Sequence, residues 1–429
     1  MSRAPSIAEL RALLLPRDEI LDRIDLEFER HCKDYKANRD RLQGDLDGLT
    51  TKLAALQKQH HPMECAAQHA GEAQWLISYT DDWVAARKVM DELDQSLKDD
   101  VNKPRLDQDA DGSWGPCCHA PYRKLEPTVD VLQEKRLIGK RLRPLKFMAP
   151  LKDIAATVKQ LKDLEVSDPD NTRVNNRDQL GARLTALSQL CFKDKFTTIF
   201  NDHRELDFDV SADYVKAYRA YLWCLQDQTT GFWGPTYVFD GKRVRVHDLS
   251  FTFHVIHYHT QNCTPGWPEI PNLDRIAATT LAMKDHEYPY GWQKPGGGLK
   301  DHNNYDVVII FRHSWDAAPQ LQKSIATEIQ KLADWCLTKS LNGEQFGHGD
   351  PTISSYYYGV RFLDEIGLWG DPFWRSGPIP RPSGVPTPDK IRQNLQRGFS
   401  RIRDDSEYSE TIAQILGLSL RRDGARSGA

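Results

Sequence analysis

The densest polar segment of the chain places five reactive side chains in a row: His302, Asn303, Asn304, Tyr305 and Asp306. A glycine-rich turn precedes the segment and an apolar run follows it, so we expect it at the start of an inward-facing helix. An imidazole, two amides, a phenol and a carboxylate at one place can bind a polar substrate and transfer protons. The alternative is that Asn303 or Asn304 caps the helix by accepting backbone N–H groups, which would account for one asparagine only.

Three adjacent tyrosines, Tyr356, Tyr357 and Tyr358, begin a second apolar helix. Successive residues on a helix are separated by about 100°, so the three rings cannot all face one direction. At least one ring should therefore face the interior of the domain, where a phenol can donate a proton. The alternative is amphipathic packing, with the rings half-buried and their hydroxyls hydrogen-bonded.

Three histidines lie close together at His254, His257 and His259, shortly after Asp248. The segment 249–259 fits a strand or a helix, and its neighbours favour a helix. On a helix His254 and His257 share a face while His259 points away, so the set does not aim three ligands at one metal ion. We therefore expect no cofactor and a polar patch of neutral histidines, one of which can act as a general base; a metal ion is the alternative.

Segments with a 3.6-residue apolar period surround these groups and must position them. We expect helices over 151–164, 176–200, 211–225, 273–284, 320–337, 353–366, 390–399 and 408–418. Between 370 and 388 many prolines and glycines indicate an extended segment that wraps around the core. The chain is therefore predicted to be all-α.

The first hundred residues, 1–100, are predicted to form a helical hairpin. We expect one amphipathic helix over 18–59 and a second from 68 to about 98. One face of the first helix carries leucines at a 4-3-4-3 spacing: Leu42, Leu46, Leu49, Leu53 and Leu56. This face is expected to pack on the second helix; the alternative is a coiled coil that joins two copies of the chain as a homodimer.

Two loops, 108–116 and 226–235, begin with Gln-Asp and end with Gly-x-Trp-Gly-Pro. The first resembles the Gln-x3-Gly-x-Trp repeat of squalene-hopene cyclases and related toroids, and the second has one residue more. Similar turns occur in protein prenyltransferases and in polysaccharide lyases built as α/α toroids. The resemblance implies an (α/α) toroid of about five to six helical hairpins, with its core over 101–370 and the segment 371–429 closing it. Trp114 or Trp233 would then line the mouth of the toroid; alternatively, both rings serve the turn and the packing.

Composition excludes several classes of protein. The 57 Lys and Arg against 61 Asp and Glu give a net charge of −4, which argues against a nucleic-acid binder. The sequence has no run of about 18 apolar residues, so no membrane-spanning helix or signal peptide is expected. Eight cysteines are scattered through the chain, which is typical of reduced thiols in the cytoplasm; a disulfide or two is the alternative.

These features favour a carbohydrate-active enzyme, most concretely a lyase that cleaves uronic-acid-containing glycans or oligosaccharides by β-elimination. The reaction needs a group that neutralises the substrate carboxylate, a base and an acid. Toroidal polysaccharide lyases use Asn, His, Tyr and Arg for these tasks. By this resemblance, the candidate catalytic residues are His302, Asn303, Asn304, Arg312, Tyr356, Tyr357 and His257.

A second set of residues is expected to contact the substrate, the aromatic ones by stacking on sugar rings: Trp114, Trp233, Trp292, His254, Asp248, Asp306, Glu287 and Tyr305. The carboxylates of this set would also serve a glycoside hydrolase, the close variant of the same hypothesis. A second hypothesis is a terpene-cyclase-like enzyme with an aromatic-lined cavity, although the sequence lacks the acid and magnesium motifs of that class. A third is a non-catalytic toroid that binds a protein partner through its N-terminal hairpin.

Overall fold

The computed structural model describes residues 5–58, 63–99, 108–114, 117–119, 121–133, 137, 141–260, 269–293, 299–346, 353–401 and 407–418. The described chain is mostly helical with a few short strands, which confirms the all-α class. It forms two compact units, each discontinuous in sequence. The N-terminal unit comprises residues 15–227 and 232–269, and the C-terminal unit comprises residues 1–14, 228–231 and 270–429. Among the described residues, no helix is both long enough and apolar enough to cross a membrane.

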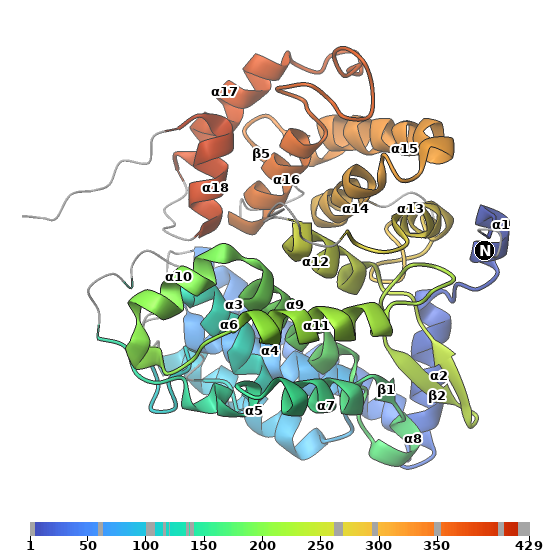
Figure 1. Cartoon of the computed structure of the whole chain (residues 1–429). Coiled ribbons are helices and arrows are strands. Elements are labelled where there is room, and N and C mark those ends of the chain that lie inside the picture. Colours follow the sequence, from blue (N-terminus) through green and yellow to red (C-terminus); the bar gives the residue numbers. More distant parts are fainter. Residues whose placement is uncertain are drawn as a thin grey trace, which may run out of the picture. The chain divides into compact units, whose positions relative to one another are not determined.

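Four helices open the N-terminal unit where the sequence predicts two: α2 (Arg17–Glu29), α3 (Tyr35–Lys58), α4 (Glu64–Tyr79) and α5 (Trp83–Asp99) (Figure 1). Asp34 has a φ of 62° and separates α2 from α3, so the predicted helix over 18–59 is interrupted. The Asp82 carboxylate accepts the backbone N–H of Ala85 at 2.9 Å and starts α5, so the predicted helix over 68–98 is interrupted as well.

The leucine face of α3 packs inside the chain. Leu42, Leu46 and Leu53 are buried, and Leu49 and Leu56 pack against the same core. The partners are apolar side chains of α4 and α5, because α3 packs against both helices. This arrangement favours packing within one chain over a coiled coil between two copies.

The rest of the N-terminal unit alternates helices with loops. Its helices are α6 (Pro121–Leu132), α7 (Ile154–Leu164), α8 (Pro169–Thr172), α9 (Arg177–Phe192), α10 (Asp194–Asp202), α11 (Ala212–Leu225) and α12 (Leu249–Thr260), with 3-10 turns at Lys146–Leu151 and Arg204–Leu206. The central helix is α9, which packs against both α6 and α12. The predicted helix over 176–200 ends and restarts at Lys193, and the segment 249–259 is helical, as its neighbours indicate.

A small sheet, which the sequence does not predict, lies in the same unit. It consists of β1 (Val166–Ser167), β2 (Thr236–Phe239) and β3 (Lys242–Arg245). β2 pairs with β1 in parallel and with β3 antiparallel. Asp240 and Gly241 form the turn between β2 and β3, and both have positive φ angles.

The C-terminal unit is built around α14. Its helices are α1 (Ile7–Arg11), α13 (Leu273–Ala282), α14 (Asp301–Ser314), α15 (Gln322–Trp335), α16 (Ile353–Glu365), α17 (Pro388–Phe399) and α18 (Glu407–Leu416). The unit also contains a 3-10 turn at Pro319–Leu321, a π-helical turn at Cys336–Ser340 and the antiparallel strands β4 (Leu341–Asn342) and β5 (Gln345–Phe346). α14 packs against α13 and α16, and α16 packs in turn against α18. α1 packs against α13, which places the first described residues in this unit.

The two Gly-x-Trp loops have the same local structure. In each loop the glycine two residues before the tryptophan has a positive φ, 87° in the first and 76° in the second. The backbone N–H of Trp114 donates to the Thr128 hydroxyl of α6, and that of Trp233 donates to the Thr252 hydroxyl of α12, each at 3.1 Å. The sequence similarity therefore corresponds to a repeated structural unit, in which a loop tryptophan is anchored to the helix that follows.

A tryptophan in the loop after α13, in the C-terminal unit, makes one contact in common with Trp233, the bond from its indole to the preceding helix. The Trp233 indole donates to the carbonyl of Leu222, near the end of α11, at 2.8 Å. The Trp292 indole donates to the carbonyl of Thr280, near the end of α13, at 2.9 Å. The Leu222 carbonyl also accepts the backbone N–H of Gln226 at 3.1 Å, so the Trp233 indole adds a second hydrogen bond at the end of α11. Each unit thus contains a helix, a loop whose tryptophan indole bonds to a carbonyl near the end of that helix, and a second helix further along the chain.

Candidate functional site

The predicted polar segment lies inside α14 and does not cap it. The helix begins at Asp301, and its N-cap residue Lys300 makes no side-chain cap. Asn303 and Asn304 lie beyond that position and are buried, so the capping alternative is wrong. Neither amide atom of Asn304 has a hydrogen-bond partner among the described residues, an arrangement that costs about 1–3 kcal/mol. The side chain of His302 lies outside the described residues.

Tyr305 connects α14 with α16. Its phenol oxygen accepts a hydrogen bond from Nη2 of Arg361 at 2.8 Å, and the guanidinium lies 5.2 Å from the centroid of the Tyr305 ring. Burial raises the pKa of Tyr305 well above 10, so the phenol is protonated at neutral pH. Arg361 also pairs with Glu365 at 3.2 Å, and Glu365 pairs with Arg312 at 3.0 Å. One carboxylate between two guanidinium groups leaves a net positive charge here.

The three adjacent tyrosines face different directions, as their helical spacing predicts. Tyr356 is buried, and its hydroxyl donates to a backbone carbonyl. Tyr357 and Tyr358 are half-buried and lie against Tyr305, with ring centroids 6.4 Å and 6.1 Å away. Tyr357 also packs on Tyr408 of α18, at 4.4 Å between centroids. The two half-buried phenols are therefore the candidates for a proton donor, and Tyr356 has a packing role.

Asp306 is fully buried on α14. Burial raises the pKa of its carboxyl well above 3.8, although a hydrogen bond with the Tyr288 side chain opposes the rise. The group is therefore neutral over a wider pH range than an exposed aspartate, and a neutral carboxyl can donate a hydrogen bond. We call the group formed by Asn304, Tyr305, Asp306, Tyr357, Tyr358 and Arg361 the α14–α16 site; Figure 1 shows the two helices that carry it.

His254 and His257 of α12, in the N-terminal unit, both lie against Phe253 and Tyr258, on the face that their helical spacing predicts. His254 stacks on Tyr258, with ring centroids 5.8 Å apart, and His257 stacks on Phe253 at 5.0 Å. His259 contacts aromatic rings of α9 and α11 instead, at 5.2 Å and 5.3 Å. Among the residues that the structure describes, no group of three or more His, Cys, Asp or Glu is placed to hold a metal ion.

Asp248 belongs to a buried ion pair. Its carboxylate is fully buried, lies 2.8 Å from Arg177, and accepts the backbone N–H of Phe251 at 3.0 Å, which caps α12. Burial raises the pKa of Asp248, and the Arg177 charge opposes that rise. These contacts give Asp248 a structural role and leave no exposed oxygen for a sugar. Glu287 is half-buried in the turn before Trp292.

The predicted sugar-stacking tryptophans are inaccessible. Trp114 and Trp233 are 0% exposed and Trp292 is 2% exposed, so no ring face is open to a ligand. Their burial favours the packing alternative that the sequence leaves open. Arg312 is held at the far side of Glu365 and lies over Phe373, 5.2 Å from its ring centroid, so it is not part of the α14–α16 site.

One residue of the α14–α16 site is not predicted from the sequence. Arg361 follows Tyr357 by four residues, so both lie on one face of α16. That spacing could have identified it, but its contact with Tyr305 depends on how α14 packs against α16. From the predicted set, the site includes Asn304, Tyr305, Asp306 and Tyr357, whereas His254, His257 and Asp248 lie in the other unit.

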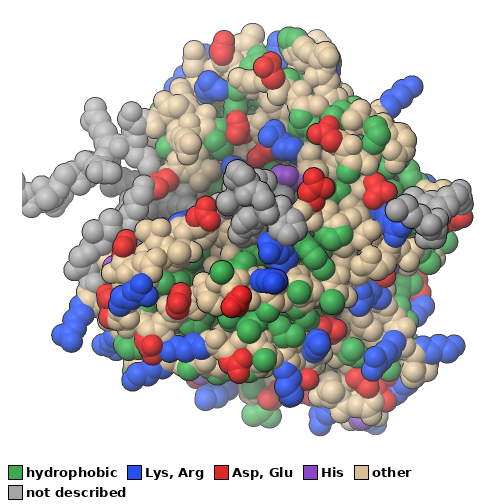
Figure 2. Space-filling view, in the orientation of Figure 1, with side chains coloured by type: hydrophobic (Ala, Val, Ile, Leu, Met, Phe, Trp, Pro, Cys, Tyr) green, Lys and Arg blue, Asp and Glu red, His purple; other side chains and the backbone are tan. Residues whose placement is uncertain are grey.

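A surface cavity of about 430 Å³ lies elsewhere in the N-terminal unit. Lys152, Arg204, Asp207 and Asp209 contribute to its lining, and Lys152 pairs with Asp207 at 2.8 Å. Its charges are mixed, as on the face shown in Figure 2, where acidic and basic side chains are interspersed. None of the predicted site residues lines this cavity.

Comparison with known proteins identifies no relative: no protein-family model, curated protein or solved structure matches the chain. The resemblance of the two loops to toroidal enzymes therefore stays a prediction. A function has to be argued from the side chains themselves.

Proposed function

We propose that the chain is a carbohydrate-active enzyme, a lyase that cleaves uronate-containing oligosaccharides by β-elimination at the α14–α16 site. The observation that carries the proposal is the hydrogen-bonded pair of Tyr305 and Arg361, flanked by the rings of Tyr357 and Tyr358. A guanidinium among phenols suits a substrate that is both anionic and rich in hydroxyl groups.

The reaction removes the proton alpha to the uronate carboxylate and breaks the bond to the oxygen at the β position. A base receives the proton, an acid protonates the leaving oxygen, and a carbon–carbon double bond remains in the product. The developing negative charge on the carboxylate is the feature that the enzyme must stabilise. Arg361 and the Asn304 amide supply this stabilisation, and Arg361 takes the role that the sequence assigns to Arg312.

Proton transfer is assigned to the half-buried phenols of α16 and to an imidazole of α14. Tyr357 protonates the leaving oxygen, because it is accessible and lies against the Tyr305–Arg361 pair. His302, two residues before Asn304 in the first turn of α14, is the proposed base. Burial raises the pKa of Asp306 and so disfavours a negative charge that would repel the substrate.

The proposal includes an (α/α) toroid as the architecture. Its support is the repeated unit of helix, tryptophan loop and helix, formed by α11, Trp233 and α12 in one unit and by α13, Trp292 and α14 in the other. A cytoplasmic location, with imported oligosaccharides rather than polymers as substrates, is part of the same proposal. The Cys65–Cys117 disulfide is the alternative to reduced thiols that the sequence leaves open, and such bonds are rare in the cytoplasm.

The reaction class is tested by incubating the purified chain with a panel of uronate oligosaccharides and polymers. Elimination generates an unsaturated uronate that absorbs in the ultraviolet, and mass spectrometry separates it from a hydrolysis product, which contains one more water. We expect absorbance and the unsaturated mass with at least one substrate. Saturated products would contradict the lyase in favour of a glycoside hydrolase, and the absence of any product across the panel would contradict both.

A further inference from the structure

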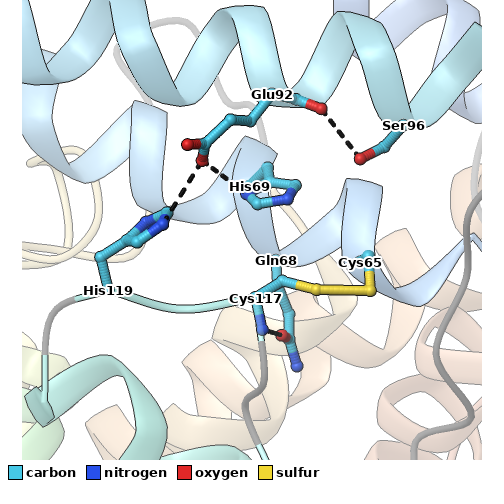
Figure 3. The surroundings of a disulfide bond; sticks show 7 residues. All are labelled: Cys65, Gln68, His69, Glu92, Ser96, Cys117 and His119. Carbon is cyan, nitrogen blue, oxygen red and sulfur yellow. Dashed lines mark hydrogen bonds and ion pairs between the residues drawn. A yellow bond between two sulfur atoms is a disulfide. The ribbon is translucent and has the colours of Figure 1, made fainter.

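A second cluster of reactive side chains surrounds the disulfide between Cys65 and Cys117 in the N-terminal unit (Figure 3). Cys65 and His69 are four residues apart on α4 and therefore lie on one face of the helix. Cys117 and His119 are two residues apart in the segment before α6. The Cα atoms of the two cysteines are 5.4 Å apart, and the two imidazole centroids are 6.1 Å apart.

Two carboxylates orient these imidazoles. Oε2 of Glu72 lies 3.0 Å from Nδ1 of His119 and accepts the backbone N–H of the same residue at 2.9 Å. Oε2 of Glu92 lies 3.4 Å from Nε2 of His119 and 3.7 Å from Nδ1 of His69 (Figure 3). The Glu72 carboxylate on Nδ1 of His119 is the usual support of a metal-bound histidine, whereas Glu92 lies beyond hydrogen-bond distance of His69.

The cluster is incompletely paired. Nδ1 of His69 and Oε2 of Glu92 are buried, and neither has a hydrogen-bond partner within the described part of the chain. In the view of Figure 3 the His69 ring lies between Glu92 and the disulfide. While the disulfide is closed, both sulfur atoms are bonded to each other, and no three described His, Cys, Asp or Glu side chains are placed to hold a metal ion.

We propose that reduction of this disulfide converts the cluster into a zinc site with Cys65, Cys117, His69 and His119 as ligands. Two thiolates and two neutral imidazoles form the ligand set that Zn²⁺ prefers in structural sites. Glu72 keeps its contact with Nδ1 of His119, and the Nε2 atom turns from Glu92 to the metal. Glu92 then supports His69, its other imidazole contact.

The chemical steps balance with a dithiol as the reductant. The disulfide takes up two electrons and two protons and becomes two thiols, while the dithiol is oxidised to its own disulfide. Zn²⁺ then displaces the two thiol protons. In tetrahedral zinc coordination with Zn–S bonds of about 2.3 Å, the sulfurs are about 3.8 Å apart. Rotation of the two side chains reaches that separation from Cα atoms 5.4 Å apart.

The test uses Co²⁺ as a spectroscopic probe for the zinc site. The full chain is reduced with a dithiol, freed of it under anaerobic conditions and titrated with Co²⁺, alongside the oxidised chain. We expect one Co²⁺ to bind per reduced chain, with the intense visible bands of tetrahedral coordination and a thiolate charge-transfer band. One Zn²⁺ per chain should displace the bound Co²⁺ and abolish both signals. The oxidised chain should show neither band. Absence of stoichiometric tetrahedral binding to the reduced chain would overturn the proposal.

Variants assign the ligands, with helical content checked by circular dichroism. Cys65→Ser and His69→Ala should each weaken Co²⁺ binding at least 100-fold, and Glu72→Gln should weaken it about 10-fold, as loss of a supporting carboxylate does. Cys118→Ser is the matched control, because this neighbouring buried thiol is outside the disulfide. Wild-type affinity in Cys65→Ser or His69→Ala, or equal loss in Cys118→Ser, would contradict the assigned ligand set.

Discussion

Asn304 is a polar side chain in a place that otherwise favours an apolar one. It is 0% exposed, and the α14 residues from Val307 to Phe311 that follow it are buried and apolar. Its amide contributes an unpaired donor and acceptor among the described residues, which lowers the stability of the fold. Such a cost is expected where a side chain binds a ligand. Buried polar groups are normally hydrogen-bonded within the protein, and functional sites are the usual exceptions.

Replacing Asn304 by leucine should therefore stabilise the protein while it abolishes turnover. Leucine has a similar size and removes the unpaired amide, so we expect the free energy of unfolding to rise by about 1 kcal/mol. Thermal unfolding followed by circular dichroism measures the change. The control is Asn394→Leu on α17, where the amide oxygen accepts a hydrogen bond from Arg397 at 2.6 Å and no gain is expected. A lower unfolding temperature for Asn304→Leu would contradict this role.

Asp306 gives the protein a specific dependence of stability on pH. Its folded-state pKa lies above the unfolded value of about 4, so the folded state binds more protons in this range. Stability is then lost as the pH rises above about 4, by at most about 1.4 kcal/mol per pH unit. Asp306→Asn cannot titrate and should gain stability relative to wild type from pH 4 to pH 7, as measured by chemical denaturation. A difference between the two proteins that does not vary with pH would exclude this effect.

At the level of elements, periodicity predicts most helices, but not their breaks. The predicted ranges 211–225, 273–284 and 353–366 agree with α11, α13 and α16 to within a few residues, because each has a regular apolar face. The breaks at Asp34 and Lys193 depend on single backbone positions that leave the apolar period unchanged. The β2–β3 hairpin could have been predicted, because the Asp240-Gly241 pair is a recognised turn signal between two segments in which apolar and polar residues alternate.

The sequence predicts which residue types form the candidate site, but not which of these residues contact one another. The sequence identifies Asn304, Tyr305 and Tyr357 because polar groups cluster at the starts of two apolar helices. It does not identify the bond between Tyr305 and Arg361, because that bond requires α14 and α16 to be neighbours. Spacing within one helix is local information, whereas helix packing depends on the whole unit.

Both tryptophan loops are held by a threonine hydroxyl of the following helix, so removing either hydroxyl should lower the stability of the fold by a similar amount. Thr128→Val and Thr252→Val each remove the hydroxyl that accepts a tryptophan backbone N–H at 3.1 Å, and each should cost about 1–3 kcal/mol of unfolding free energy. Thr327→Val is the control, because its hydroxyl is exposed on α15 and bonds only within the helix. Stability indistinguishable from wild type for both buried variants would show that the loops are not anchored in this way.

At the scale of the whole molecule, each compact unit is built from separate stretches of the sequence. Residues 1–14 belong with residues 270–429, because α1 packs against α13 and Leu10 is completely buried. The predicted boundary at residue 100 therefore separates α2 to α5 from helices of their own unit and groups them with α1.

Truncation of Leu10 should affect the C-terminal unit selectively. Leu10→Ala removes a buried side chain and should lower the stability of that unit by about 2–5 kcal/mol. Hydrogen exchange read by mass spectrometry should show faster opening of α13 and α14, with α3 to α5 unchanged. Leu46→Ala, in the buried core around α3, is the reciprocal control. Equal acceleration throughout the chain in Leu10→Ala would contradict independent units.

The most direct test of the proposed function compares neighbouring tyrosines in the assay for unsaturated uronate. Tyr357→Phe removes the proposed proton donor and should reduce kcat by about 100-fold or more, with the fold intact by circular dichroism. Tyr356→Phe removes a phenol that bonds a backbone carbonyl outside the α14–α16 site, so its kcat should stay close to wild type. An unchanged kcat for Tyr357→Phe, or an equal loss in both variants, would contradict elimination at the α14–α16 site.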